Sequence, residues 1–311
     1  MAITPIYNQP KLVGDYEPSV AYNMIGKVAK QIIKGVTADN RLEELKRGEI
    51  NNGETVEDVV FGLVEGSPLV DKIPGEPFSA PEAAPTVRYF KDWTTTQYAT
   101  GLTHRNLRKY LTEGNSIEDI AGIVAGQLAQ SEANDDYAAI RDMFAQGTGD
   151  DLPVDVTSDV LGGKSAATTY KELLVALKNT VAGMTFVNDN FNGANIKRRT
   201  LREDVRILMP YQLFNAIEVD ELAGVFNLSK AEIQDRIILV DGKLGATDDG
   251  AYNVVVFDKN AVQVWTRLYE MTSAFDAQQL RTNYFLTVDR MYGLSPLYDC
   301  CYVTYNPGVQ A

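Results

Sequence analysis

The sequence predicts an α+β fold in which a proline-rich extended arm leads into a long helix, then into an α/β region and a series of strands. Five of the twelve prolines lie between Pro68 and Pro85, where each fixes φ and removes a backbone donor. An apolar helical pattern of nearly thirty residues follows Ser116. From Tyr252 onward, alternating and β-branched runs are separated by turn residues. These three patterns exclude an all-helical chain.

The composition is that of a globular, acidic protein. Of its 311 residues 45% are apolar, and 42 acidic side chains against 29 basic ones give a net charge of −13. We do not expect avid binding to nucleic acid, because clustered lysine and arginine dominate the affinity for phosphate. The sequence has no signal-peptide pattern and no run of about 18 apolar residues, so no membrane partner is expected.

The first 110 residues predict a loose lead-in and a long excursion. A modest helix follows the apolar spacing from Tyr22 to Ile33, and a short turn is predicted at residues 40–47. The segment 65–101 is too long for an ordinary connection and too rich in aromatic residues for a disordered one. We predict that it returns through 93–103 as the second side of a long hairpin. Its aromatic side chains are expected to contact another copy of the chain, and they are Phe78, Tyr89, Phe90, Trp93 and Tyr98.

The long helix is predicted to begin at Ser116, which serves as N-cap with Asp119 at the third helical position. At about 1.5 Å per residue it is about 43 Å long, more than the diameter of a small domain. We interpret it as a strut. Its predicted core face consists of Ile117, Ile120, Val124, Leu128, Tyr137, Ile140 and Phe144.

After a Gly/Asp-rich break at 147–163, helical and strand patterns alternate. The predicted helices lie at 170–181 and 211–217, with a further capping box at Ser229 and Glu232. The predicted strands lie at 205–209, 237–240, 252–257, 261–270, 279–290 and 297–305.

Residues that carry chemistry are scarce. His104 is the only histidine, and no nucleophile elbow or zinc-binding pattern surrounds it, so we predict a structural or exposed side chain. Cys300 and Cys301 are adjacent in a predicted strand, so they face opposite sides and form no intrachain disulfide. No catalytic residue, metal site or cofactor is predicted.

Two further clusters leave alternatives open. The stretch 188–193 has the rhythm of a calcium loop but lacks the first aspartate and the final glutamate, which favours a polar surface loop. Acidic pairs such as Asp135 and Asp136 are predicted to be helix caps or solvated loops. The one basic cluster either lines a pore, meets nucleic acid, stays solvated or pairs with a neighbour's carboxylates. It comprises Lys197, Arg198, Arg199 and Arg202.

Three blocks of the chain carry a resemblance to a known family. The first is S-E-A-N-D-D-Y at 131–137; the second is 219–227 followed by 237–241; the third is 258–259 with Leu268, Met271 and 283–285. With the order of elements, these blocks resemble the major capsid (head) proteins of tailed bacteriophages. The fold of that family is the HK-ninety-seven-type, and the resemblance is strongest to phi-twenty-nine-like podoviruses.

The resemblance implies a division of the chain and a set of partners. It implies an N-terminal arm at 1–50 and an extended β-hairpin loop at 51–110. A peripheral domain with the spine helix and a β-sheet then spans 111–165 and 263–296, and an axial α/β domain spans 166–262 and 297–311. Copies are expected to form hexamers and pentamers of an icosahedral shell around double-stranded DNA, without sequence-specific binding. Scaffolding and portal proteins are implied partners, and the expected location is the virion capsid, assembled in the host cytoplasm.

Two alternatives remain at this point. An encapsulin-like nanocompartment shell has the same fold but encloses a cargo enzyme. A carboxylate- and metal-dependent α/β enzyme belongs to a different class, and metal analysis of the purified protein distinguishes it.

Overall fold

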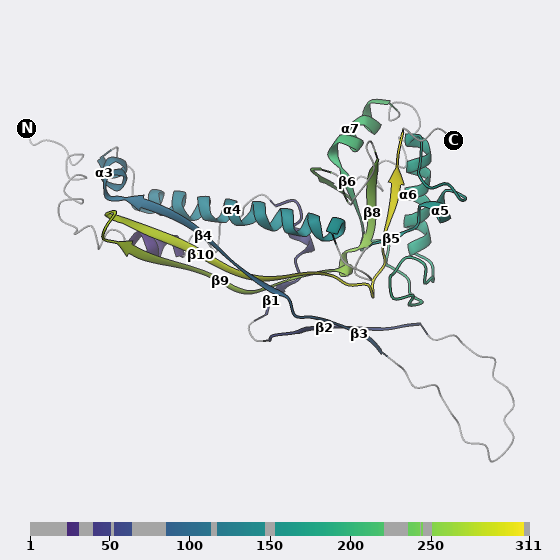
Figure 1. Cartoon of the computed structure of the whole chain (residues 1–311), viewed down its shortest axis with the longest axis horizontal. Coiled ribbons are helices and arrows are strands. Elements are labelled where there is room, and N and C mark those ends of the chain that lie inside the picture. Colours follow the sequence, from purple (N-terminus) through teal and green to yellow (C-terminus); the bar gives the residue numbers. More distant parts are fainter. Residues whose placement is uncertain are drawn as a thin grey trace, which may run out of the picture.

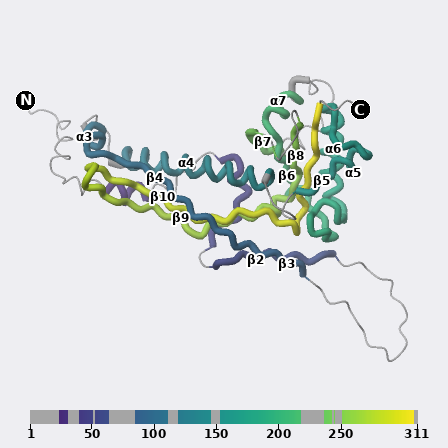
Figure 2. Tube along the Cα trace, in the orientation of Figure 1, coloured from purple at the N-terminus to yellow at the C-terminus, as the bar shows by residue number. Residues whose placement is uncertain are grey.

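The molecule is elongated, with a compact unit at one end and a long helix lying along a sheet toward the other (Figures 1 and 2). This computed structural model describes residues 24–30, 40–50, 53–63, 85–112, 117–146, 153–220, 236–242, 244 and 251–307. Among these residues, no helix is long and apolar enough to cross a membrane.

The long sheet has four strands in the order β1-β9-β10-β4. Their bounds are β1 (Gly48–Glu49), β9 (Val262–Asp276), β10 (Arg281–Leu294) and β4 (Trp93–Thr103). The helix α4 (Ile117–Gln146) lies along this sheet, and the shorter helix α3 (His104–Thr112) follows β4 at the far end (Figure 1). Alternate residues of β4 and β10, such as Leu102 and Leu286, are buried in one cluster with Val124 of α4. The period of two in the strands therefore places one face of the sheet against the helix.

The compact unit is a five-stranded sheet in the order β5-β11-β8-β6-β7. The strands are β5 (Val154–Asp155), β11 (Cys300–Tyr305), β8 (Tyr252–Asp258), β6 (Val205–Pro210) and β7 (Ile237–Val240). The helices of this unit are α5 (Thr157–Val160), α6 (Tyr170–Met184) and α7 (Tyr211–Asp220), and short 3-10 turns lie at η2 (Glu43–Leu45) and η4 (Lys259–Ala261).

Both faces of the five-stranded sheet are covered. Leu173 and Leu177 of α6 pack with Val254 and Val303 on one face. Ile140 and Phe144, at the end of α4, pack with the other face and with the start of β9. The apolar stripe of α4 is thus divided between two cores, one under each sheet, and the helix joins them as the strut that its length predicts.

Leucine 128 gives a direct test of this packing. We expect Leu128→Ala to lower the free energy of unfolding by about 2 to 5 kcal/mol, because the side chain is buried between α4 and the long sheet. Ile123→Ala on the same helix is the matched control, since Ile123 is 58% exposed, and it should change stability by about 0.5 kcal/mol or less. Equal chemical-denaturation midpoints for the two variants would contradict the assigned core face.

A two-stranded hairpin, β2 (Val56–Phe61) with β3 (Pro85–Phe90), lies beside the compact unit (Figure 1). The prediction that 93–103 forms the second side of the hairpin is therefore wrong. That segment is β4, which pairs antiparallel with β10 from Trp93↔Met291 to Thr103↔Arg281. The physical reason is its alternation, since Tyr98 and Leu102 face the α4 cluster once β4 is at the edge of the long sheet.

Helix α3 falls where an extended loop was expected. It is short and highly charged, and among its described side chains only Leu107 is buried, so few apolar residues mark it in the sequence. Several predicted features lie outside the described residues: Phe78, the caps at Ser116 and at Ser229 with Glu232, the block 221–227 and the side chain of Ile117.

Candidate functional site

The outer face of the hairpin presents several exposed apolar side chains. Residues that pair across the two strands point to the same face, and Val59 pairs with Val87, Phe61 with Pro85 and Glu57 with Tyr89. Phe61 and Tyr89 are 62% and 59% exposed, and Val59 is also exposed. Exposed apolar patches of this kind mark interaction surfaces.

The inner face of the same hairpin is anchored to its own chain. Phe90 and Val56 are buried against Met291 of β10. The carboxylate of Asp58, itself buried, accepts hydrogen bonds from Ser295 Oγ at 2.5 Å and Tyr298 Oη at 3.4 Å. Isolated two-stranded hairpins are marginally stable in water, so these contacts are what fix its position.

This anchoring corrects part of the expectation for the aromatic residues of the arm. Phe90 packs inside its own chain, and Tyr98 packs against the α4 cluster. Trp93 is half-buried, and its Nε1 donates a hydrogen bond to the Glu54 carbonyl at 2.8 Å. The guanidinium carbon of Arg267 lies 4.6 Å from the centroid of the Trp93 ring. Of the predicted contact residues that the structure describes, Tyr89 is the one that is exposed.

Gly293 shows how closely the hairpin approaches β10. A Cβ atom at this position would lie 2.6 Å from Phe90 Cδ1, closer than real contacts allow. We expect Gly293→Ala to displace the ring, to destabilise the subunit by about 1 to 3 kcal/mol and to increase hydrogen exchange in β2 and β3. Gly122→Ala is the control, since its Cβ meets nothing within 4 Å and alanine favours the helix. Unchanged exchange in the hairpin would show that Phe90 does not anchor it.

A buried ionic network joins α4 to β10 and to the segment before β1. Arg290 on β10 forms ion pairs with Glu132 and, at 2.8 Å, with Asp136, and all three side chains are buried. Lys46 Nζ lies 2.8 Å from the Asp136 carboxylate, and Asn40 Nδ2 donates to it at 2.9 Å. Tyr292 Oη donates to the same carboxylate at 2.9 Å.

The network contradicts the prediction that Asp136 is solvated. Glu132 and Asp136 follow Leu128 and precede Ile140 at steps of four residues, so they lie on the apolar face of the helix. That interruption of the apolar stripe was the signal that sequence reasoning missed. Because α4 crosses from one sheet to the other at this point, the network fills the space between the two cores with paired charge.

Burial sets the ionisation of the network. Desolvation raises the pKa of Glu132, and the charges of Arg290 and Lys46 oppose that rise. A raised pKa means that the folded state favours the protonated carboxyl group. The stability this gives is fully present at pH values below the pKa of the unfolded chain, and it is lost as the pH rises through the pKa of the folded state. Ionised Glu132 therefore adds little net stability, as expected for buried ion pairs, and the network mainly fixes which segments pair.

The basic loop and the calcium-like stretch fold together. Arg198 donates from Nη2 to Asp258 at 3.0 Å and from Nη1 to the Leu297 carbonyl at 2.8 Å, and its guanidinium lies 4.3 Å from the Tyr298 ring centroid. Arg198 therefore pairs with a carboxylate of its own chain. Lys197, Arg199 and Arg202 have exposed side chains.

The neighbouring asparagines also make structural hydrogen bonds. Asn188 Nδ2 donates to the carbonyls of Gly183 and Phe186, and Asn192 Nδ2 donates to Asp299 at 3.2 Å. In the described part of the chain, no group of three or more histidine, cysteine, aspartate or glutamate residues is arranged to hold a metal ion.

The two cysteines lie far from the single histidine in the molecule. Cys300 and Cys301 are both free and buried, on opposite faces of the five-stranded sheet as their adjacency predicts. Burial raises the pKa of both thiols, so neither is a ready nucleophile. His104 is exposed at the start of α3, at the other end of the molecule (Figure 1).

Comparison with known proteins assigns the family. The model of the family described as "Phi29-like phage major capsid protein" matches residues 19–304. The chain belongs to this family. The match covers both sheets, the long helix and the hairpin, so the resemblance carried by the three sequence blocks is confirmed.

Similar proteins include two phage major capsid proteins. That of Bacillus phage GA-1 is 22% identical over 275 residues, which cover 86% of this chain and 56% of the relative. That of Bacillus phage PZA is 19% identical over 270 residues, covering 86% of this chain and 59% of the relative. The chain thus spans a little over half the length of these curated relatives.

Solved structures share the mixed helix and sheet fold of this Phi29-like chain. The capsid structure of Staphylococcus phage Andhra aligns with a TM-score of 0.63 at 11% identity, over 88% of this chain and 86% of that chain. The capsid of an empty GTA particle aligns with a TM-score of 0.57 at 12% identity, over 87% and 91%.

Proposed function

We propose that this chain is the major capsid protein of a tailed phage and that its copies assemble into the icosahedral head shell around double-stranded DNA. The observation that carries the proposal is the family match over residues 19–304. The shared fold with solved phage capsids and the exposed outer face of the hairpin support it. The protein then acts as a building block without a reaction of its own.

The proposed subunit has the HK-ninety-seven-type architecture. An N-terminal arm is proposed at 1–50 and the extended loop at 51–92, because 93–103 is β4 of the long sheet and 104–112 is α3. The peripheral domain comprises 111–165 and 263–296, and the axial domain comprises 166–262 and 297–311. The separate buried cores of the four-stranded sheet with α4 and of the five-stranded sheet with α6 and α7 support two domains. At the bounds, β1 and β4 join the peripheral sheet, and β5 joins the axial sheet.

Subunits are proposed to meet as hexamers and pentamers, with each hairpin lying on a neighbouring copy. An acidic chain of net charge −13 encloses DNA without holding it, since its field repels phosphate. Scaffolding and portal proteins are proposed partners, and assembly in the host cytoplasm gives the virion capsid.

Electron microscopy of negatively stained particles tests the proposal. We expect closed shells when the chain is expressed alone or with its genomic neighbours, and nuclease-resistant double-stranded DNA inside particles made with those neighbours. A protein that stays monomeric in both cases, or shells that hold a cargo enzyme in place of DNA, would contradict it.

A further inference from the structure

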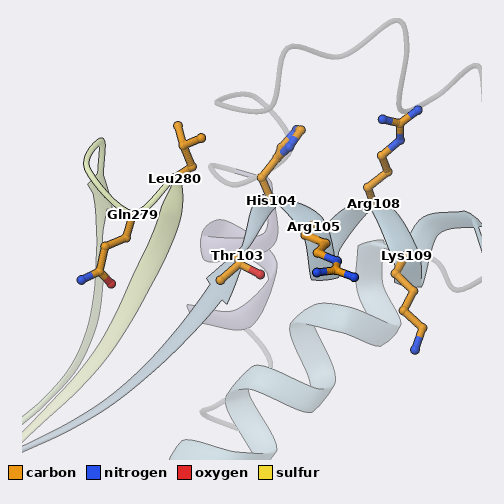
Figure 3. Close-up of a pocket in the computed structure, with 7 residues that line it drawn as sticks. All are labelled: Thr103, His104, Arg105, Arg108, Lys109, Gln279 and Leu280. Atoms are coloured by element: carbon orange, nitrogen blue, oxygen red, sulfur yellow. The ribbon is translucent and has the colours of Figure 1, made fainter.

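A cationic cleft of about 730 Å³ lies between α3 and the turn that joins β9 to β10, at the opposite end of the molecule from the five-stranded sheet (Figures 1 and 3). None of the described residues that line it is acidic. The lining residues are Thr103, His104, Arg105, Arg108, Lys109, Gln279 and Leu280. In a chain with an excess of acidic residues, this is a local reversal of charge.

The backbone fixes both walls of the cleft. The amide of His104 donates to the carbonyl of Leu280 at 3.0 Å, which ties the first residue of α3 to the turn. Leu107 is buried and holds the helix on the core, so Arg105 and Arg108 are directed away from it with exposed side chains. In Figure 3 the side chains of His104, Arg108 and Leu280 extend to the same side.

One residue at the rim of the cleft is apolar and strained. Leu280 has a φ of 45°, in the left-handed region that disfavours side chains with a Cβ, and it is 61% exposed. Phe275, on the strand leading to the same turn, is also exposed. Because most of the Leu280 side chain is exposed, it buries little surface in its own chain and is available to a partner.

We propose that this cleft binds an acidic segment of a second copy of the chain. The inference rests on the proposed shell function and names one contact within it. Arginines that lie beside an exposed apolar side chain are typical of protein interfaces, where they bind carboxylates in bidentate pairs. Each copy carries 42 acidic residues that supply such carboxylates. Duplex DNA is the less suitable occupant, because the rest of the acidic surface repels it.

The experiment compares Arg105→Glu/Arg108→Glu with the control Lys91→Glu/Lys171→Glu in the full-length chain. Both change the net charge equally, and the control lysines are exposed but lie away from the cleft. Sedimentation velocity across protein and salt concentrations measures self-association, and thermal melting checks the fold. We expect the arginine variant to associate about tenfold more weakly or worse, with the control unchanged.

Leu280→Gly provides a second test, whose expected result cannot be produced by loss of folding. Glycine relieves the left-handed backbone while it removes the apolar rim, so we expect an equal or higher melting temperature together with weaker association.

Three outcomes would overturn the inference. Normal shells from the arginine variant would overturn it and leave the proposed function intact. Wild-type protein that stays monomeric both alone and with its genomic neighbours would overturn both. Wild-type binding to a short DNA duplex, measured by fluorescence anisotropy and lost in the arginine variant with assembly unchanged, would assign the cleft to nucleic acid.

Discussion

Asp136→Ala is expected to destabilise the folded subunit by about 3 to 5 kcal/mol. The Asp136 side chain is 1% exposed and accepts from Asn40 and Tyr292 while pairing with Lys46 and Arg290. Its removal leaves the buried Arg290 with Glu132 as its one remaining carboxylate, and the partly buried Lys46 with the exposed Glu43. A buried charge with too few partners is costly. Urea unfolding followed by circular dichroism measures the change.

Asp241→Ala is the matched control for this loss. Asp241 also accepts from residues of α4, at 2.7 Å from Tyr137 Oη and 2.8 Å from Arg141 Nη1, but its side chain is exposed. Solvent screening limits such a pair to about 1 kcal/mol or less. If both variants unfold at the same urea concentration, the network does not hold the two cores together.

The second large effect is expected on assembly. Phe61→Asp should leave the isolated subunit within about 0.5 kcal/mol of wild-type stability, because the ring is exposed on the outer face of the hairpin. It should lower the yield of closed shells by about tenfold or more, since a buried aromatic anchor at an interface contributes about 2 kcal/mol or more and recurs in every subunit. Shell yield is measured by gradient sedimentation and microscopy.

The control is Val175→Asp, which places the same charge on an exposed apolar position of α6. Shells formed normally by the Phe61 variant, or lost equally in both, would show that the hairpin face is not an intersubunit surface. Hydrogen exchange of β2 and β3 in the dilute variant verifies that the hairpin remains anchored.

Local patterns in the sequence predicted much of the fold. The apolar spacing after Ser116 predicted α4, and the β-branched run at 205–209 predicted β6. The partner of β4 was missed because pairing over nearly two hundred residues leaves no local signal. Helix α3 was missed because it has only nine residues and is strongly polar, and the cationic cleft depends on that helix.

Sequence reasoning about the candidate contact surfaces was less accurate. Aromatic content indicated the hairpin but not which face of it is exposed, because the face depends on strand register. Asp136 was predicted to be solvated because two adjacent aspartates on a helix are usually exposed to solvent. Its burial follows only from the meeting of α4, β10 and Lys46.

The two edge strands of the long sheet have a consequence for biosynthesis. Gly48 of β1 pairs with Trp265, and Trp93 of β4 pairs with Met291, so strands near the start of the chain are completed by strands near its end. A nascent chain of only the first 250 residues can therefore form neither the complete long sheet nor an anchored hairpin. Non-local pairing of this kind delays folding until synthesis is nearly complete. The long sheet and the anchored hairpin are therefore expected to form only at the end of synthesis.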